Sequence, residues 1–243
     1  MKILALELSS GRGSVAWLDT EWQPARAAAA AREGACAPGK EVFSREWAND
    51  RKNSGPFFEH LAEVQKQFGK SDTIVVGLGP GSYAGTRIAI SAGIGMSFGG
   101  VDEASAEPVE GIRSKENGRR GGPRSTRLIG YPSICAIECD GPQYCVIGDA
   151  RRNSFFYARV SSRDLVDGPT LMAEAELRRK LDKLDGRMPI FTTEKLPQFE
   201  RAQLRYPAAA MLAQIATTAK RNFAQPPLEP MYLREPHITV PKK

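Results

Sequence analysis

The chain has 243 residues, of which 41% are hydrophobic and 26% are charged. This composition supports one large domain or two lobes with a buried core, and it excludes a chain that is disordered throughout. The chain carries 34 Lys and Arg against 28 Asp and Glu. This mild positive excess permits an acidic partner such as RNA but does not require one.

The N-terminus, MKILALELSS, has an apolar run of only about five residues, and polar residues follow it directly. A secretory signal needs a longer apolar region, and a membrane-spanning helix needs about 20 apolar residues. We therefore expect no membrane association, and a cytoplasmic protein.

The cysteines and histidines do not predict a metal site. A structural zinc site needs about four thiolate or imidazole ligands at short paired spacings. The chain has no Cys-x-x-Cys pair, and its two histidines lie far apart. Reduced, packed thiols are the expectation. The residues concerned are Cys36, Cys135, Cys139, Cys145, His60 and His237.

The chain opens with the pattern of a β-hairpin. Apolar runs at 2–8 and 14–19 flank the turn residues 9–13, and residues 41–47 could add a third strand. Residues 21–40, with five consecutive alanines, are interpreted as a helical turn or loop inserted in a hairpin connection.

An amphipathic helix is predicted from Pro56, because apolar residues recur at Phe57, Leu61, Val64 and Phe68. Proline suits the first turn of such a helix. The apolar run 73–78 then predicts a strand buried on both faces. A glycine-rich turn and a helix over about 84–98 follow it.

Residues 100–126 are interpreted as a charged, glycine-rich insertion or linker, acidic at first and then basic. Alternating strands and helices resume after it. The predicted elements are strands at 127–132, 143–150, 154–160 and 188–194, a short helix capped by Ser133, and helices at 173–184 and 208–222.

The order of these elements predicts the fold class. Strands come first as a meander and then alternate with helices, twice along one chain, which is typical of an α/β protein with two related lobes. The pattern suits the duplicated actin-like, RNase H-like (ASKHA) fold. The N-terminal lobe would span 1–99, with 208–243 packing back on it, and the C-terminal lobe would span 127–207.

The segment GLGPGSYAGTR, residues 77–87, resembles phosphate-binding loops but fits neither common pattern. A Walker loop needs Lys-Ser/Thr where this chain has Thr86-Arg87, and the spacing Gly79, Gly81, Gly85 is one residue too long for a Rossmann fingerprint. By itself the segment predicts a tight turn. Gly79 and Gly81 would have positive φ, Pro80 would stiffen the loop and Ser82 would cap the helix.

Four motifs in the same order carry a resemblance to a known family. Residues 77–95 are similar to the Gly-Pro-Gly-Ser-Phe-Thr-Gly-Leu-Arg-Ile-Gly signature of the TsaB (YeaZ) family of glycoprotease-like proteins. ILALELSS with SVAWL resembles the family's opening strands, GDARRNSFFYARV its Asp-Ala-Arg-Arg hairpin, and PMYLREP its C-terminal Pro-x-Tyr-Leu-Arg. The signature-loop residues are Gly79, Pro80, Gly81, Ser82, Gly85 and Arg87.

The resemblance implies a non-catalytic scaffold in the complex that places threonylcarbamoyl on a tRNA adenosine. The chain would heterodimerise with a TsaD-type catalytic subunit, with a TsaE-type ATPase in the full complex and tRNA bound through it. Glu7 replaces the family's usual strand-end Asp. The TsaD metal motif His-x-x-x-His is absent, because the residue four positions after His60 is Val64. No cofactor is expected, and a homodimer of the chain alone is left open.

Two other classes of function remain open. A standalone RNA-binding protein could use the basic insertion, and an ASKHA-type ATPase or kinase could use the same superfold. The basic residues of the first alternative are Arg113, Lys115, Arg119, Arg120, Arg124 and Arg127.

The partner interface is expected on the helices at about 57–68 and 84–98. The second helix has one charged residue, Arg87, whereas a helix on the surface of a monomer normally keeps one polar face. It is therefore either internal or covered by a second protein. The expected interface residues are Phe57, Leu61, Val64, Ala84, Ile88, Ser91, Ala92 and Gly95.

Overall fold

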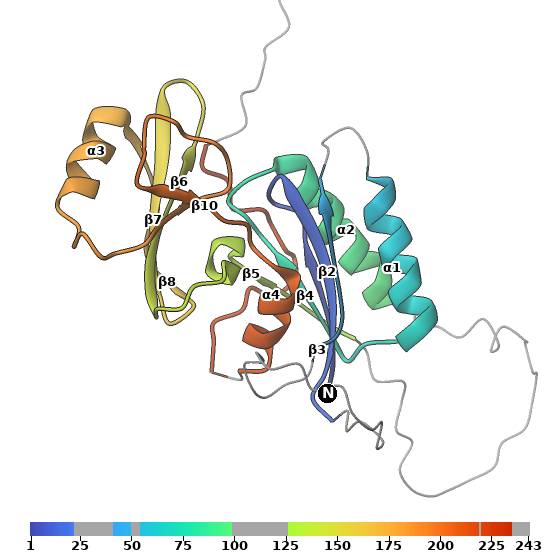
Figure 1. Ribbon diagram of the computed structural model, residues 1–243. Coiled ribbons are helices and arrows are strands. Elements are labelled where there is room, and N and C mark those ends of the chain that lie inside the picture. Colours follow the sequence, from blue (N-terminus) through green and yellow to red (C-terminus); the bar gives the residue numbers. More distant parts are fainter. Residues whose placement is uncertain (22–40, 50–53, 99–125, 219, 235–243) are drawn as a thin grey trace, which may run out of the picture.

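In a computed structural model, the described part of the chain forms two five-stranded sheets and four α-helices (Figure 1). The structure describes residues 1–21, 41–49, 54–98, 126–218 and 220–234. The predicted insertions at 21–40 and 100–126 therefore lie almost entirely outside the described residues. The mixed α/β class predicted from the sequence is confirmed.

The first sheet has the strand order β3-β2-β1-β4-β5. Its first three strands form an antiparallel meander, and β4 and β5 run parallel to β1. Every residue of β4 is buried, as expected for a central parallel strand with both faces covered. The strands are β1 (Lys2–Glu7), β2 (Arg12–Asp19), β3 (Glu41–Ala48), β4 (Thr73–Gly77) and β5 (Arg127–Tyr131).

The position of β5 corrects the predicted lobe boundary. The sequence places residues 127–131 in the C-terminal lobe, but β5 pairs with β4 from Thr73↔Arg127 to Gly77↔Tyr131. The first sheet therefore extends beyond the insertion. A parallel strand needs a crossover connection, and α2 supplies it.

The second sheet repeats the pattern of the first. Its order is β10-β9-β6-β7-β8, with an antiparallel meander β6–β8 and two further strands parallel to β6. Read from the end of the meander, both sheets thus have the same strand order. The strands are β6 (Gln143–Asp149), β7 (Ser154–Ser161), β8 (Asp164–Ala173), β9 (Ile190–Thr192) and β10 (Ala202–Leu204).

The helices cover the sheets in layers (Figure 1). Helices α1 (Gly55–Phe68) and α2 (Tyr83–Phe98) lie on one face of the first sheet, and α4 (Ala209–Ala216) packs on the other. Helix α3 (Glu174–Asp182) covers the outer face of the second sheet. A short 3₁₀ helix, η2 (Ser133–Ala136), follows β5.

Helix α4 ends earlier than the predicted 208–222. Its C-cap is Thr217, whose hydroxyl donates a hydrogen bond to the Gln214 carbonyl at 2.7 Å. Threonine hydroxyls compete for backbone groups in this way, and the two consecutive threonines 217 and 218 favour the end of the helix.

A shared core joins the two lobes. Buried side chains from the inner faces of both sheets meet around α4 and η2, in one continuous cluster that includes Ile3 and Ala5 of β1, Val146 of β6 and Leu212 of α4. Separate cores lie under α1 and α2 and under α3. Within the described residues, no helix is long and apolar enough to cross a membrane.

Candidate functional site

The glycine-rich loop between β4 and α2 is shaped by close contact with the β1–β2 turn. As predicted, φ is positive at Gly79 (+93°) and at Gly81 (+157°). A Cβ at Gly81 would lie 2.0 Å from the carbonyl oxygen of Ser9, and one at Gly85 would lie 2.1 Å from that of Leu8. Backbone approaches backbone here, so only glycine fits. Pro80, which lies between Gly79 and Gly81 and follows a cis peptide bond, is buried.

Ser82 caps helix α2, as the sequence predicts. The N–H of Gly85 donates to its Oγ at 3.2 Å, which satisfies one of the free donors of the first turn. The Thr86 hydroxyl donates to the Ser82 carbonyl at 2.9 Å. Arg87 lies over the Tyr83 ring at 5.1 Å and donates to its hydroxyl at 2.6 Å. The loop and the helix start therefore form one fixed unit.

Ser133 has a different role from the predicted helix cap. Its Oγ accepts the N–H of Gly79 at 2.9 Å, and its own N–H donates to the Gly79 carbonyl at 2.8 Å. The residue before η2 is Pro132, which makes no side-chain cap. Ser133 thus fastens the loop to the start of η2. Only the fold brings these two residues, 54 positions apart, together.

Glu7, at the end of β1, is completely buried beside this loop. Its Oε1 accepts the Ser9 N–H at 2.7 Å, while Oε2 has no hydrogen-bond partner among the described residues. A Cβ at Gly77 would lie 1.8 Å from Oε2, so glycine leaves the room for this carboxyl. Burial raises the pKa of Glu7, because the charged form loses its hydration.

Helix α2 has one buried face and one exposed face. Gly85, Ala89 and Gly93 are among the residues packed on the sheet. Ile88 and Ala92 are half-buried against the same core. The opposite face carries small residues, two large apolar ones and one charged residue, Arg87. Its exposed residues are Ala84, Arg87, Ser91, Ile94 (38% exposed), Gly95 and Phe98 (74% exposed).

This exposed face decides between the two interpretations of α2. No described segment covers it, so within the described chain the helix is not wholly internal. An apolar helix face left open to water is typical of an interaction surface.

Helix α1 corrects part of the predicted interface. Phe57, Leu61 and Val64 are 1%, 6% and 0% exposed and belong to the core under α1 and α2. The apolar stripe of α1 faces its own sheet, so these three residues cannot touch a partner. The exposed apolar residue of α1 is Phe58, at 50%.

The C-terminal segment, which the sequence analysis expects to pack back on the N-terminal lobe and to carry a family motif, completes the site. Leu228 is buried in the core under α1 and α2, and the N–H of Met231 donates to the Leu78 carbonyl at 2.8 Å. Tyr232 packs against Tyr83 with ring centroids 5.4 Å apart. The C-terminal segment therefore runs beside the glycine-rich loop, from the core of the first lobe to the surface at Tyr83.

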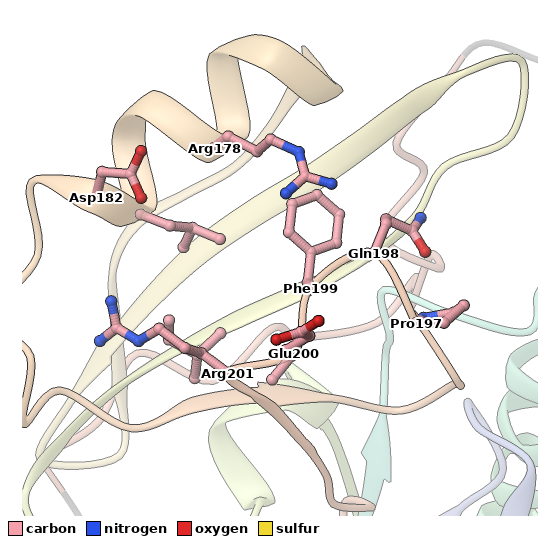
Figure 2. A pocket seen from close by; sticks show the side chains of 10 residues that line it. Arg178, Asp182, Pro197, Gln198, Phe199, Glu200 and Arg201 are labelled. Carbon is pink, nitrogen blue, oxygen red and sulfur yellow. The ribbon is translucent and has the colours of Figure 1, made fainter.

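A cavity of about 450 Å³ lies on the outer face of the second lobe beside α3 (Figure 2). The guanidinium of Arg178 lies 5.1 Å above the Phe199 ring and is held by the Glu174 carboxylate at 2.7 Å. Leu181 and Ile190 form part of its apolar lining. Arg178 thus already pairs with Glu174 and stacks on Phe199. The cavity is also remote from the glycine-rich loop.

The described residues contain no group of three His, Cys, Asp or Glu side chains that could hold a metal ion. Cys135, Cys139 and Cys145 are free thiols. Burial raises the pKa of Cys135 to about 12, so this thiol stays protonated at neutral pH.

The glycine-rich loop, the capped helix and the repeated α/β sheet define a YeaZ-like fold. Two structures from Pseudomonas aeruginosa show this likeness: YeaZ, and an uncharacterized protein with similarity to the peptidase YeaZ. Each is 16% identical to this chain with a TM-score of 0.61, over 96% of this chain and 99% of the other. No family model and no curated protein matches the sequence.

Proposed function

We propose that this chain is a TsaB (YeaZ)-type protein, the non-catalytic subunit that heterodimerises with a TsaD-type enzyme in tRNA threonylcarbamoyladenosine synthesis. The observation that carries the proposal is the exposed apolar face of α2, directly behind the glycine-rich loop. The YeaZ-like fold over nearly the whole chain supports it. In this proposal the two similar sheets are the halves of a duplicated actin-like, RNase H-like fold.

The composition of the α2 face suits a helix-on-helix contact. Ala84, Ser91 and Gly95 are exposed and small, so a facing helix could approach closely. Ile94 and Phe98 offer large apolar surfaces whose burial would favour association. The same face could also pair two copies of this chain, and the TsaD-type subunit would then compete with that homodimer.

In this proposal the chain supplies a surface and the partner supplies the chemistry. Glu7, where the family usually has a strand-end Asp, is buried with a raised pKa. This carboxyl accepts the Ser9 N–H and is enclosed beside Gly77, an environment that suits a structural role at the loop better than the binding of a metal or phosphate. The protein would act in the cytoplasm with a TsaE-type ATPase, on the threonylcarbamoyl-adenylate made by a TsaC-type enzyme.

Reconstitution tests this function directly. Purified TsaD-type, TsaE-type and TsaC-type proteins with tRNA, threonine, bicarbonate and ATP should make threonylcarbamoyladenosine only when this chain is added. The chain alone with tRNA and threonylcarbamoyl-adenylate should yield none. Modification of tRNA by the isolated chain would contradict the non-catalytic role, and full activity without the chain would contradict the subunit role.

A further inference from the structure

The mouth of the cleft between the lobes brings together two tyrosines and several arginines. Tyr83 starts α2, Tyr232 lies in the C-terminal segment, and both rings are about half exposed, at 50% and 47%. Their centroids are 5.4 Å apart with an interplanar angle of 39°. Arg87 lies over the Tyr83 ring, 5.1 Å from its centroid. The two rings are thus fixed in place, and about half of each is open to solvent.

The second lobe contributes positive charge to the same place through the β6–β7 turn. Arg151, Arg152 and Asn153 all have positive φ, at 63°, 53° and 55°. Such values are uncommon for residues other than glycine. Arg234 bridges to this turn, since its Nη2 donates to the Arg151 carbonyl at 3.1 Å. The side chains of Arg151 and Arg152 are exposed and make no hydrogen bond or ion pair with described residues.

Nearby carboxylates shape the turn. Asp149 Oδ1 accepts the Arg151 N–H at 2.6 Å, and Glu194 Oε1 accepts the Asp149 N–H at 2.7 Å. Each of these acids is thus engaged by the backbone. Glu229 is exposed close to Tyr232, and Asp149 lines the same cavity. Within the described residues, none of these acids forms an ion pair with Arg151 or Arg152, so these two guanidinium groups are available to an anionic ligand.

The size of the cleft mouth limits what can enter it. The cavity lined by Tyr83, Arg151, Tyr232 and Arg234 has a volume of about 280 Å³. Pockets that enclose a small-molecule ligand usually measure ~300–1,000 Å³. One base or one phosphate would fit inside, and the rest of the ligand would lie along the surface. A single-stranded nucleic acid that continues past the cavity fits this small volume better than a free nucleotide does.

We propose that this cleft mouth, defined by Tyr83, Arg87, Arg151, Tyr232 and Arg234, is a binding site for single-stranded RNA. Bases would stack on the two tyrosine rings and phosphates would contact the arginines, the combination that single-strand binding surfaces use. The proposal goes beyond the partner-subunit role, because the isolated chain should bind RNA by itself, with no TsaD-type protein on α2.

Fluorescence anisotropy with the full chain and a labelled single-stranded RNA of about ten nucleotides tests the site. Tyr232→Ala should weaken binding about tenfold or more, the effect of removing one stacked base. Tyr232→Phe keeps the ring and should bind like the unchanged chain. Arg151→Gln should lower the dependence of affinity on salt, by a slope of about 0.7 for each phosphate that is no longer neutralised. Arg45→Gln, at an exposed arginine on the edge strand β3, is the matched control and should change little.

Three results would overturn the proposal. They are absence of RNA binding, RNA affinity unchanged by Tyr232→Ala, and binding of free ADP as tight as that of the RNA. The second would place the contact elsewhere in the chain, since a site outside the cleft does not need Tyr232. Circular dichroism of Tyr232→Ala shows whether the variant is folded. If Tyr232→Ala is unfolded, the separate variants Tyr232→Phe and Arg151→Gln still test the site.

Discussion

The two lobes share a sheet pattern but differ in one connection. In the first lobe, β4 and β5 are joined through the glycine-rich loop and helix α2. In the second lobe, the corresponding strands β9 and β10 are joined by residues 193–201, which contain no helix. Helices α1 and α3 occupy matching positions after the third strand of each meander. Among the described residues, the exposed Ile94 and Phe98 thus lie on a helix that has no counterpart between β9 and β10.

The difference shows how one scaffold can keep its core and vary its surface. The outer face of the second sheet is covered by α3 and by the loop that carries Phe199. Between this loop and α3 lies the cavity of Figure 2, which Leu181 and Ile190 also line. The first lobe instead carries a helix whose outer face is mostly small and apolar, with Arg87 as its one charged residue. A repeated fold therefore does not imply a repeated site.

The largest expected effect concerns the core that the lobes share. Leu212 of α4 is fully buried between the two sheets, and Leu212→Ala should lower the free energy of unfolding by about 2–5 kcal/mol. Amide hydrogen exchange should show that both lobes lose protection, because residues of both sheets line the cavity created.

Leu177→Ala is the matched control for this prediction. Leu177 is equally buried, but it lies under α3 in the separate core of the second lobe. Its truncation should reduce protection mainly in that lobe. Equal effects of both variants on both lobes would mean that the cores are not separate.

A smaller effect is expected from two glycines of the same helix. Gly85→Ala would place Cβ 2.1 Å from the Leu8 carbonyl oxygen, and overpacking of this kind should cost about 1–3 kcal/mol. Gly95 has no atom within 4 Å of a Cβ, so Gly95→Ala should stabilise the chain by roughly 0.5–1 kcal/mol through helix propensity. Urea unfolding of the two variants measures the contrast. Equal stabilities would show that the loop relaxes away from β1.

The smallest effect concerns the pH dependence of stability that Glu7 produces. Its pKa is raised in the folded chain, so the folded state holds this proton more tightly than the unfolded state. The stability that the proton provides is present below the unfolded pKa, near 4.5, and is lost as pH rises through the folded pKa. Glu7→Gln cannot ionise and should remove this decline from thermal unfolding curves measured between about pH 4 and 8. A decline of unchanged size in the variant would assign it to another group.

Much of the fold could be predicted because its signals are local. The spacing of Phe57, Leu61 and Val64 predicts α1, and the place of Ser82 before an apolar helix predicts its role as a cap. Strand β8 was missed because Gly168-Pro169 interrupts it and most of its residues are not buried. Strand β10 has only three residues, too few for a pattern.

The site was less predictable, because it depends on contacts distant in sequence. Ser133 bonds Gly79, Tyr232 packs on Tyr83, and Arg234 bonds Arg151. No periodicity reports such pairs. The apolar stripe of α1 was mistaken for a partner surface because a stripe that faces the sheet and one that faces a second protein have the same spacing.

The central claim is that the exposed face of α2, and not the outer helix of the second lobe, binds the partner. Ser91 on α2 and Ala175 on α3 are both small and exposed. Calorimetric titration of a purified TsaD-type subunit into Ser91→Arg and Ala175→Arg, each shown to be folded by circular dichroism, compares the two surfaces. The account predicts that Ser91→Arg abolishes binding through clash and a desolvated charge, while Ala175→Arg binds like the unchanged chain. Unchanged binding by folded Ser91→Arg would contradict it.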